Sequence, residues 1–143
     1  MNLTSDTFAI LLAVGCGAVI GLERQLKHKP AGLRTNVLIC LGAAVFTIIS
    51  ERMAGDKDSI TRIAAQIVTG VGFLGAGAVI QDRGGIYGLT SAATIWLVAS
   101  IGMACGAKLY QLAVISTLIA IVVLVGLRHL EKRFERSNEK HEP

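Results

Sequence analysis

Five apolar stretches, each close to the length that crosses a lipid bilayer, occupy most of this 143-residue chain. They cover residues 7–22, 33–50, 63–80, 89–104 and 109–127. A helix rises about 1.5 Å per residue, so stretches of this length match a hydrocarbon core of about 30 Å. Lipid offers no hydrogen bonds to the backbone, which leaves helices or closed barrels as the spanning structures. Because the alternation typical of barrel strands is absent, the sequence predicts an all-α polytopic membrane protein, a bundle of five transmembrane helices.

The composition supports a membrane protein over a soluble helical domain. Hydrophobic residues make up 52% of the chain and charged residues only 17%, whereas soluble helices carry polar residues along one face. We expect one membrane domain at residues 1–127 and a short charged cytoplasmic tail at 128–143. Three cysteines, Cys16, Cys40 and Cys105, lie in the apolar stretches. Their odd number and lack of a pairing pattern predict packing residues, not a disulfide framework.

Lysine and arginine are distributed unevenly between the connections. With the N-terminus outside, ten of the 14 cationic residues lie on the cytoplasmic side and four lie outside. Cytoplasmic loops of membrane proteins carry an excess of Lys and Arg. The sequence therefore predicts an N-out, C-in orientation in a multi-pass protein.

Polar residues cluster near both ends of the predicted helices, and we expect function on the cytoplasmic side. The candidate cluster there consists of Glu23, Arg24, Arg34, Thr35, Asp82 and Thr90. Ionisable groups near the hydrocarbon usually have partners, so we predict a Glu23–Arg34 ion pair, extended by Asp82 or nearby hydroxyls. The alternative is that the cations reach toward lipid headgroups. In the outer half of the third stretch, we expect Gln66, four residues after Arg62, to hydrogen-bond to another helix.

Glycines concentrate inside the apolar stretches. Small residues let helices pack closely in lipid, and Gly17 and Gly21 form a GxxxG element in the first stretch. The third stretch carries four more within eight residues, Gly70, Gly72, Gly75 and Gly77. These predict a third helix at the centre of the bundle. The alternative is a flexible or pore-lining helix.

Signals for enzymatic chemistry are weak. The three histidines are isolated, and no nucleophile–base set, P-loop or dinucleotide fingerprint occurs. Glu51, Asp56 and Asp58 could offer oxygen ligands for a divalent cation, but a solvated loop balanced by nearby cations is the favoured explanation. We expect no enzyme, no cofactor, no confidently assigned metal site and no nucleic-acid partner. The expected surroundings are the lipid bilayer.

Three stretches make the chain resemble the MgtC/SapB family of bacterial inner-membrane proteins. They are GLERQLKHKPAGLRTNVLICLGA (21–43), RIAAQIVTGVGFLGAGAVI (62–80) and GLTSAATIWLVASIG (88–102). The Asp-Pro that usually precedes the arginine of the third-helix motif is absent, since Ser59, Ile60 and Thr61 precede Arg62. The family's motif positions carry over as Glu23, Arg24, Gln25, Arg34, Thr35, Arg62, Gln66 and Thr90, with the glycines at 70, 72, 75 and 77.

The resemblance implies a role in adaptation to low magnesium, acid stress or virulence. It implies a regulator of other membrane systems, with ATP synthase a suggested partner and homo-oligomers a further expectation. Many relatives carry a soluble domain after the fifth helix, where this sequence has the charged tail. The alternative function is a Mg²⁺ or proton transporter or channel. A cation path needs acidic or carbonyl ligands through the midplane, and the middle thirds of the five stretches contain no Asp or Glu, which favours the regulator.

Overall fold

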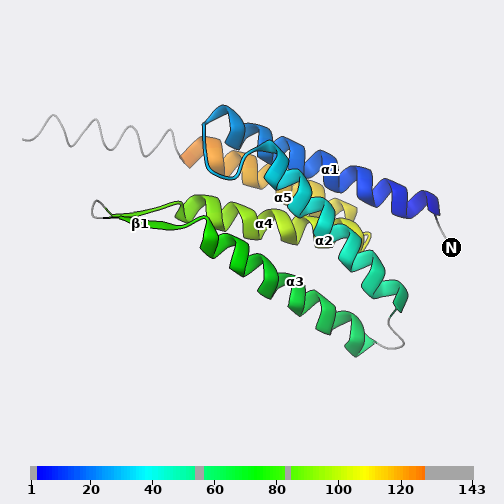
Figure 1. Ribbon diagram of the computed structural model, residues 1–143. Coiled ribbons are helices and arrows are strands. Elements are labelled where there is room, and N and C mark those ends of the chain that lie inside the picture. Colours follow the sequence, from blue (N-terminus) through cyan, green and yellow to red (C-terminus); the bar gives the residue numbers. More distant parts are fainter. Residues whose placement is uncertain (1–2, 54–56, 83–84, 128–143) are drawn as a thin grey trace, which may run out of the picture.

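The computed structural model describes residues 3–53, 57–82 and 85–127, with the backbone alone at 57–60 and 80–82. These residues form five long helices, a short β-hairpin and a final π-helical turn (Figure 1). The elements are α1 (Leu3–Leu26), α2 (Leu33–Met53), α3 (Lys57–Gly77), β1 (Ile80–Asp82), β2 (Gly85–Tyr87), α4 (Leu89–Gly106), α5 (Tyr110–Val122) and η1 (Val123–Leu127). The predicted all-α class is confirmed. The tail at 128–143 lies outside the described residues.

Four helical segments are long and apolar enough to cross a membrane. They are α1, α2, α4 and the continuous segment Tyr110–Leu127 formed by α5 and η1. The fifth long helix, α3, has 21 residues and packs alongside them. A 21-residue helix is about 31 Å long, which matches the hydrocarbon thickness. Five helices of spanning length therefore run along a common direction (Figure 1).

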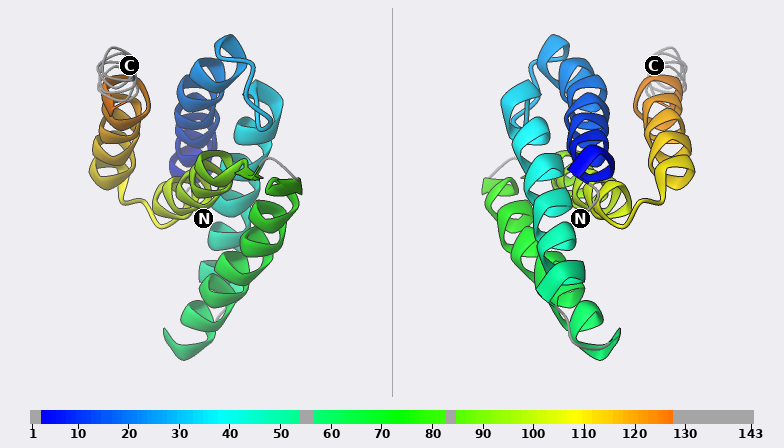
Figure 2. Two further views of the ribbon diagram at one scale, coloured as in Figure 1. Left: turned by 90° about the vertical axis from the view of Figure 1, so that its left-hand side faces the viewer. Right: turned by 90° about the vertical axis from the view of Figure 1, so that its right-hand side faces the viewer.

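Helices α1, α2 and α4 form the centre of the bundle, and each contacts the other two. Helix α3 packs on α2 and α4 at one edge, whereas α5 packs on α1 and α4 at another (Figure 2). The expectation that the third helix lies at the centre is therefore wrong. The physical reason is that α1 and α4 each place two glycines against α2, so that α2 is enclosed from two sides.

The core is built from small side chains. One buried cluster joins α1, α2, α4 and α5 through Ala13, Cys16, Ile20, Cys40, Ala44, Val98, Ile101, Ala104, Cys105, Ala113 and Ala120. Apart from a few aliphatic residues such as Ile20 and Ile101, many large apolar side chains point outward; Phe73 is 82% exposed and Trp96 is 54% exposed. Lipid solvates large apolar groups as well as a protein core does, so helices associate through small residues. The three cysteines are buried and free, as the sequence indicated.

Three buried or half-buried hydroxyls bond to the backbone of their own helices. Thr47, Thr94 and Thr117 donate to carbonyl oxygens four residues earlier, at 2.7–2.8 Å. A hydroxyl that bonds back in this way is satisfied without a partner on another helix. These polar side chains are therefore compatible with a membrane-embedded core.

A β-hairpin replaces the predicted end of the third apolar stretch. Helix α3 ends at Gly77, and Ile80 pairs with Tyr87 in the two-stranded antiparallel sheet. Gly88 follows with φ 91°, and a Cβ there would collide with the carbonyl oxygen of Ala78. Only glycine combines this left-handed conformation with so close an approach. The sequence predicts a helix to residue 80 because Val79 and Ile80 continue the apolar run, but hydropathy does not distinguish helix from strand over so few residues.

Candidate functional site at the hairpin end

The end of the bundle that carries the β-hairpin, here called the hairpin end, also holds the α1–α2 connection. The connection closes tightly because the backbone N–H of Lys29 donates to the carbonyl of Arg24 at 3.0 Å. From α2, the fully buried Asn36 donates through Nδ2 to the carbonyls of Ala31 and Gly32, both at 2.8 Å. These bonds satisfy carbonyls that precede the helix and fix the connection against the C-terminal end of α1.

A cavity of about 600 Å³ opens at this end, and we call it the hairpin-end pocket. Its wall combines the end of α1 and the following connection, the β2–α4 junction, and η1. The lining residues are Glu23, Arg24, Lys27, His28, Lys29, Pro30, Ile86, Tyr87, Gly88, Leu89, Thr90, Ser91, Val123, Leu124 and Leu127. One part of the wall is charged and another is aliphatic, so the pocket suits a ligand with both kinds of surface.

Arg24 is the fixed charged group of this pocket. It is only 3% exposed, and its Nη2 donates to the hydroxyl of Ser91 on α4 at 2.6 Å. Its neighbour Glu23 is partly buried, and Oε2 of that side chain has no hydrogen-bond partner among the described residues. Burial of an acceptor without a partner is costly. The pocket therefore presents a held guanidinium beside a carboxylate oxygen that can accept a further hydrogen bond.

The predicted Glu23–Arg34 ion pair is wrong. Arg34 is exposed, and in the described part of the chain no salt bridge joins it to Glu23. Arg34 and Thr35 line a separate depression between α2 and α3. The reason lies in helix geometry, because adjacent residues are separated by 100° around the axis. Arg24 is the residue that turns inward toward α4, and Glu23 lines the hairpin-end pocket beside it.

The remaining members of the predicted cytoplasmic cluster lie at this end as well. Thr90 lines the hairpin-end pocket, in the first turn of α4. The backbone of Asp82 ends strand β1, but its side chain lies outside the described residues. Sequence reasoning therefore brought Glu23, Arg24 and Thr90 to one cavity. The bond between Arg24 and Ser91 was not predicted.

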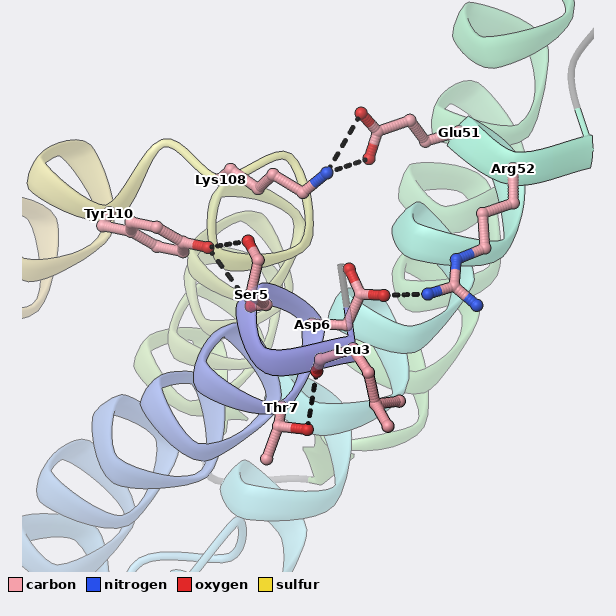
Figure 3. Close-up of polar contacts among 8 residues, drawn as sticks. All are labelled: Leu3, Ser5, Asp6, Thr7, Glu51, Arg52, Lys108 and Tyr110. Carbon is pink, nitrogen blue, oxygen red and sulfur yellow. Dashed lines mark hydrogen bonds and ion pairs between the residues drawn. The ribbon is translucent and has the colours of Figure 1, made fainter. Parts of the chain in front are cut away.

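The opposite end of the bundle, here called the N-terminal end, is closed by polar contacts (Figure 3). Asp6 of α1 forms an ion pair with Arg52 of α2, and the hydroxyls of Ser5 and Tyr110 lie 3.1 Å apart. The ring of Tyr110 also packs edge-on against Phe8, with centroids 5.0 Å apart. These contacts join the start of α1 to α2 and α5. Asp6, which is 8% exposed, was missed because a single carboxylate near the N-terminus has no distinguishing pattern.

Glu51 takes part in an exposed ion pair at the same end. Its carboxylate lies 3.2 Å from Nζ of Lys108 in the α4–α5 connection (Figure 3). Asp56 lies outside the described residues, and so does the side chain of Asp58. Among the residues that the structure describes, no group of three metal-binding side chains comes together. Glu51 is therefore paired with a lysine, whereas the two aspartates of the alternative cation site fall outside the side chains that the structure describes.

Gln66 lies in an apolar groove between α2 and α3, which we call the α2–α3 groove. The groove has a volume of about 570 Å³ and is lined by Leu38, Ile39, Gly42, Ala43, Phe46, Ile63, Gln66, Ile67, Gly70, Val71 and Leu74. We expected Gln66 to bond to another helix. It is instead exposed, and none of the described residues bonds its side chain. Arg62, one turn earlier, is also exposed.

The glycines divide into packed and open positions. A Cβ at Gly17 would lie 2.9 Å from the Asn36 carbonyl oxygen, and one at Gly21 would lie 2.8 Å from the Cα of Leu33. On α3, only Gly75 has a neighbour, Ala92 of α4; positions 70, 72 and 77 have nothing within 4 Å. The first helix therefore uses its GxxxG element inside the bundle, whereas α3 presents most of its glycines outward.

Sequence reasoning missed a second GxxxG element, Gly102 and Gly106 of α4. A Cβ at Gly106 would lie 2.5 Å from the carbonyl oxygen of Ala44, and one at Gly102 would collide with that of Cys40. The i,i+4 spacing was present in the sequence and equalled that of Gly17 and Gly21. Both pairs face α2, which explains why α2 is enclosed.

Residues 10–133 match the MgtC family. The chain is 47% identical to Protein MgtC of Brucella abortus over 119 residues, covering 83% of this chain and 50% of that protein. It is 44% identical to Protein MgtC of Salmonella typhimurium over 127 residues, covering 89% and 54%. It is 45% identical to the "Putative magnesium transporter YhiD" of Escherichia coli over 136 residues, covering 90% and 63%.

The chain thus spans half to just under two thirds of the length of these relatives. No solved structure matches it. The family match covers most of the chain, including every helix after α1 and all the residues that line the hairpin-end pocket. This chain is a membrane protein that belongs to the MgtC family.

Proposed function

We propose that this chain is a non-enzymatic regulator in the bacterial inner membrane that acts by binding another membrane complex through the α2–α3 groove. The observation that carries the proposal is the exposed amide of Gln66 in that otherwise apolar groove. A carboxamide that faces hydrocarbon has no hydrogen-bond partner, which is unfavourable. A transmembrane helix of a partner would supply both apolar contacts and a hydrogen bond.

The open glycines of the groove support a helix as the occupant. Gly42 on α2 and Gly70 on α3 both line it, and neither has a neighbour within 4 Å of a Cβ position. Small residues allow the backbone of a second helix to approach closely, and polar side chains then add interhelical hydrogen bonds. The groove thus combines the two features that mark helix-packing surfaces in lipid.

The distribution of charge favours a regulator over a conduit. In the described part of the chain, the buried charged side chains are Asp6 at the N-terminal end and Arg24 at the hairpin end. Between them the core holds alanine, cysteine and aliphatic side chains together with the hydroxyls of Thr94 and Thr117, which bond to the backbone of their own helices. A cation path through lipid requires oxygen ligands along its length. The family resemblance suggests ATP synthase as the partner complex and low magnesium, acid stress or virulence as the setting.

The test is co-purification of partner subunits with this chain from bacterial membranes, using variants in which larger side chains fill the α2–α3 groove. We expect the Gly42→Leu, Gly70→Leu double variant to keep its helical content by circular dichroism but to lose most of the ATP synthase subunits that the wild type retains. Gly72→Leu is the matched control, because Gly72 is equally open but does not line the groove. Equal retention by the wild type and the double variant would refute the proposal, as would equal loss in the control. Retention of a second copy of this chain alone would reassign the groove to a homo-oligomer.

Magnesium transport is the second candidate function. It is favoured by the Glu23 carboxylate oxygen in the hairpin-end pocket and by the name of the Escherichia coli relative, "Putative magnesium transporter YhiD". Purified protein in liposomes loaded with a magnesium-sensitive dye separates the two functions. Magnesium influx that is abolished by Glu23→Gln would support transport. Influx no faster than in empty liposomes would support the regulator.

A further inference from the structure

The hairpin-end pocket has a charge pattern that suits an anion. Among the residues whose side chains the structure describes, three cations, Arg24, Lys27 and Lys29, line it together with one carboxylate, that of Glu23. Arg24 is held in place by its bond to Ser91, so that its guanidinium does not have to be ordered when a ligand binds. Guanidinium and ammonium groups are the side chains that bind phosphate oxygens most strongly.

Helix α4 adds to the positive potential. It is an 18-residue helix that begins in the pocket wall at Leu89, and its N-cap residue Gly88 provides no side-chain cap. The first backbone N–H groups of a helix have no acceptor within the helix, and its N-terminus carries a partial positive charge. An anion in the pocket would be attracted by these groups as well as by the three cations.

The aliphatic part of the wall distinguishes a lipid from a small soluble anion. Val123, Leu124 and Leu127 of η1 line the pocket beside the charged residues, and η1 continues the spanning segment that begins at Tyr110. The pocket therefore combines a polar half with an apolar half at the end of a membrane helix. Basic pockets between transmembrane helices are a recurrent way to bind phospholipid headgroups.

We propose that the hairpin-end pocket binds the phosphate group of a glycerophospholipid, with the acyl chains against η1. In this arrangement, Arg24, Lys27 and Lys29 bind the phosphate oxygens. Glu23 Oε2, which is buried without a partner in the described structure, accepts a hydrogen bond from a headgroup hydroxyl or ammonium. The site shares no residue with the α2–α3 groove, so it does not depend on the function proposed for that groove.

The experiment measures retention of added lipid by the purified full chain in detergent, using native mass spectrometry. The probes are phosphatidylglycerol, phosphatidylethanolamine and phosphatidylcholine at equal concentration. The first two headgroups carry a donor for Glu23, whereas the third has none. We expect phosphatidylglycerol and phosphatidylethanolamine to be retained in preference to phosphatidylcholine. Equal retention of all three by the wild type would overturn the proposal.

Variants locate the binding site. Lys27 and Lys29 are exposed, so the Lys27→Gln, Lys29→Gln double variant removes two charges without disturbing the core. At about 1 kcal/mol for each cation near a phosphate, the affinity for phosphatidylglycerol should fall about 30-fold. The control is Lys108→Gln, which removes a cation at the N-terminal end and should change the affinity less than twofold. An equal loss in the control and the double variant would overturn the proposal, as would full retention in both.

Inorganic phosphate distinguishes the two sources of the anion. A phosphate concentration of about 10 mM should not displace the bound lipid, because the free ion makes no contact with the aliphatic wall. If phosphate displaces the lipid from the wild type at that concentration but not from the Lys27→Gln, Lys29→Gln variant, the lipid assignment would be overturned in favour of a free phosphate ion.

Discussion

Replacement of Gly102 by alanine tests the packing of α4 on α2, on which the fold depends. A Cβ at this position would collide with the carbonyl oxygen of Cys40 and would lie 2.9 Å from its carbonyl carbon and 3.0 Å from the Cβ of Ala43. Two of these three atoms belong to the backbone of α2, so no flexible side chain can move aside. Helix α4 would have to shift away from α2 to accommodate a single methyl group.

The matched control is Gly72→Ala on α3, where nothing lies within 4 Å of a Cβ. Both replacements gain helix propensity of about 1 kcal/mol, and that gain cancels when the variants are compared. Overpacking of a well-packed core costs about 1 to 3 kcal/mol. We therefore expect Gly102→Ala to be less stable than Gly72→Ala by about 1 to 3 kcal/mol.

The assay is reversible unfolding in mixed micelles of detergent and dodecyl sulfate, followed by circular dichroism at 222 nm. Gly72→Ala should unfold at the same dodecyl sulfate fraction as the wild type or at a higher one, whereas Gly102→Ala should unfold at a lower fraction. A difference between the two variants of less than about 0.5 kcal/mol would refute the contact between α4 and α2.

Three further predictions concern the two ends of the bundle. Arg52→Gln should destabilise the fold by about 1 to 3 kcal/mol, because it leaves the buried carboxylate of Asp6 without its cation. Asp6→Asn should cost less than about 1 kcal/mol. The same unfolding assay compares the two variants, and an equal loss of stability in both would contradict this expectation. Tyr110→Phe should cost about 0.5 to 1.5 kcal/mol, since it removes the hydrogen bond to Ser5 but keeps the ring contact; an unchanged unfolding midpoint would show that this bond contributes nothing. For orientation, Lys29→Cys should react with an impermeant maleimide in inverted membrane vesicles and not in intact cells; the reverse would place the hairpin end outside.

Hydropathy was sufficient to predict the helices, because membrane insertion imposes length and apolarity on each of them separately. The arrangement of those helices was not predictable in the same way. Gly17, Gly70 and Gly102 have similar sequence surroundings, yet only the first and third pack against another backbone. A small residue in a helix shows that another helix can approach it closely. Which helix does so depends on how the loops connect the helices. The hairpin at 80–87 was missed because Val79 and Ile80 extend an apolar run without specifying its secondary structure.

The candidate site was partly predictable. Charge placement brought attention to Glu23, Arg24 and Thr90, and all three line one cavity. The partner of the buried cation could not be deduced, since a shift of one residue changes the direction of a helical side chain by 100°. The Arg24–Ser91 bond also joins residues 67 positions apart. A contact between residues so far apart in the sequence can be identified only when the packing of α1 against α4 is known.

Site-specific photocrosslinking in native membranes tests most directly whether the α2–α3 groove binds a partner. A photoreactive amino acid replaces Leu38, which lines the groove and is 65% exposed, or Leu112 on α5, which is 54% exposed and lies outside it. We expect position 38 to crosslink to a transmembrane subunit of the partner complex and position 112 to crosslink to none. Labelling of lipid alone from both positions, or the same protein crosslink from both, would contradict the proposal.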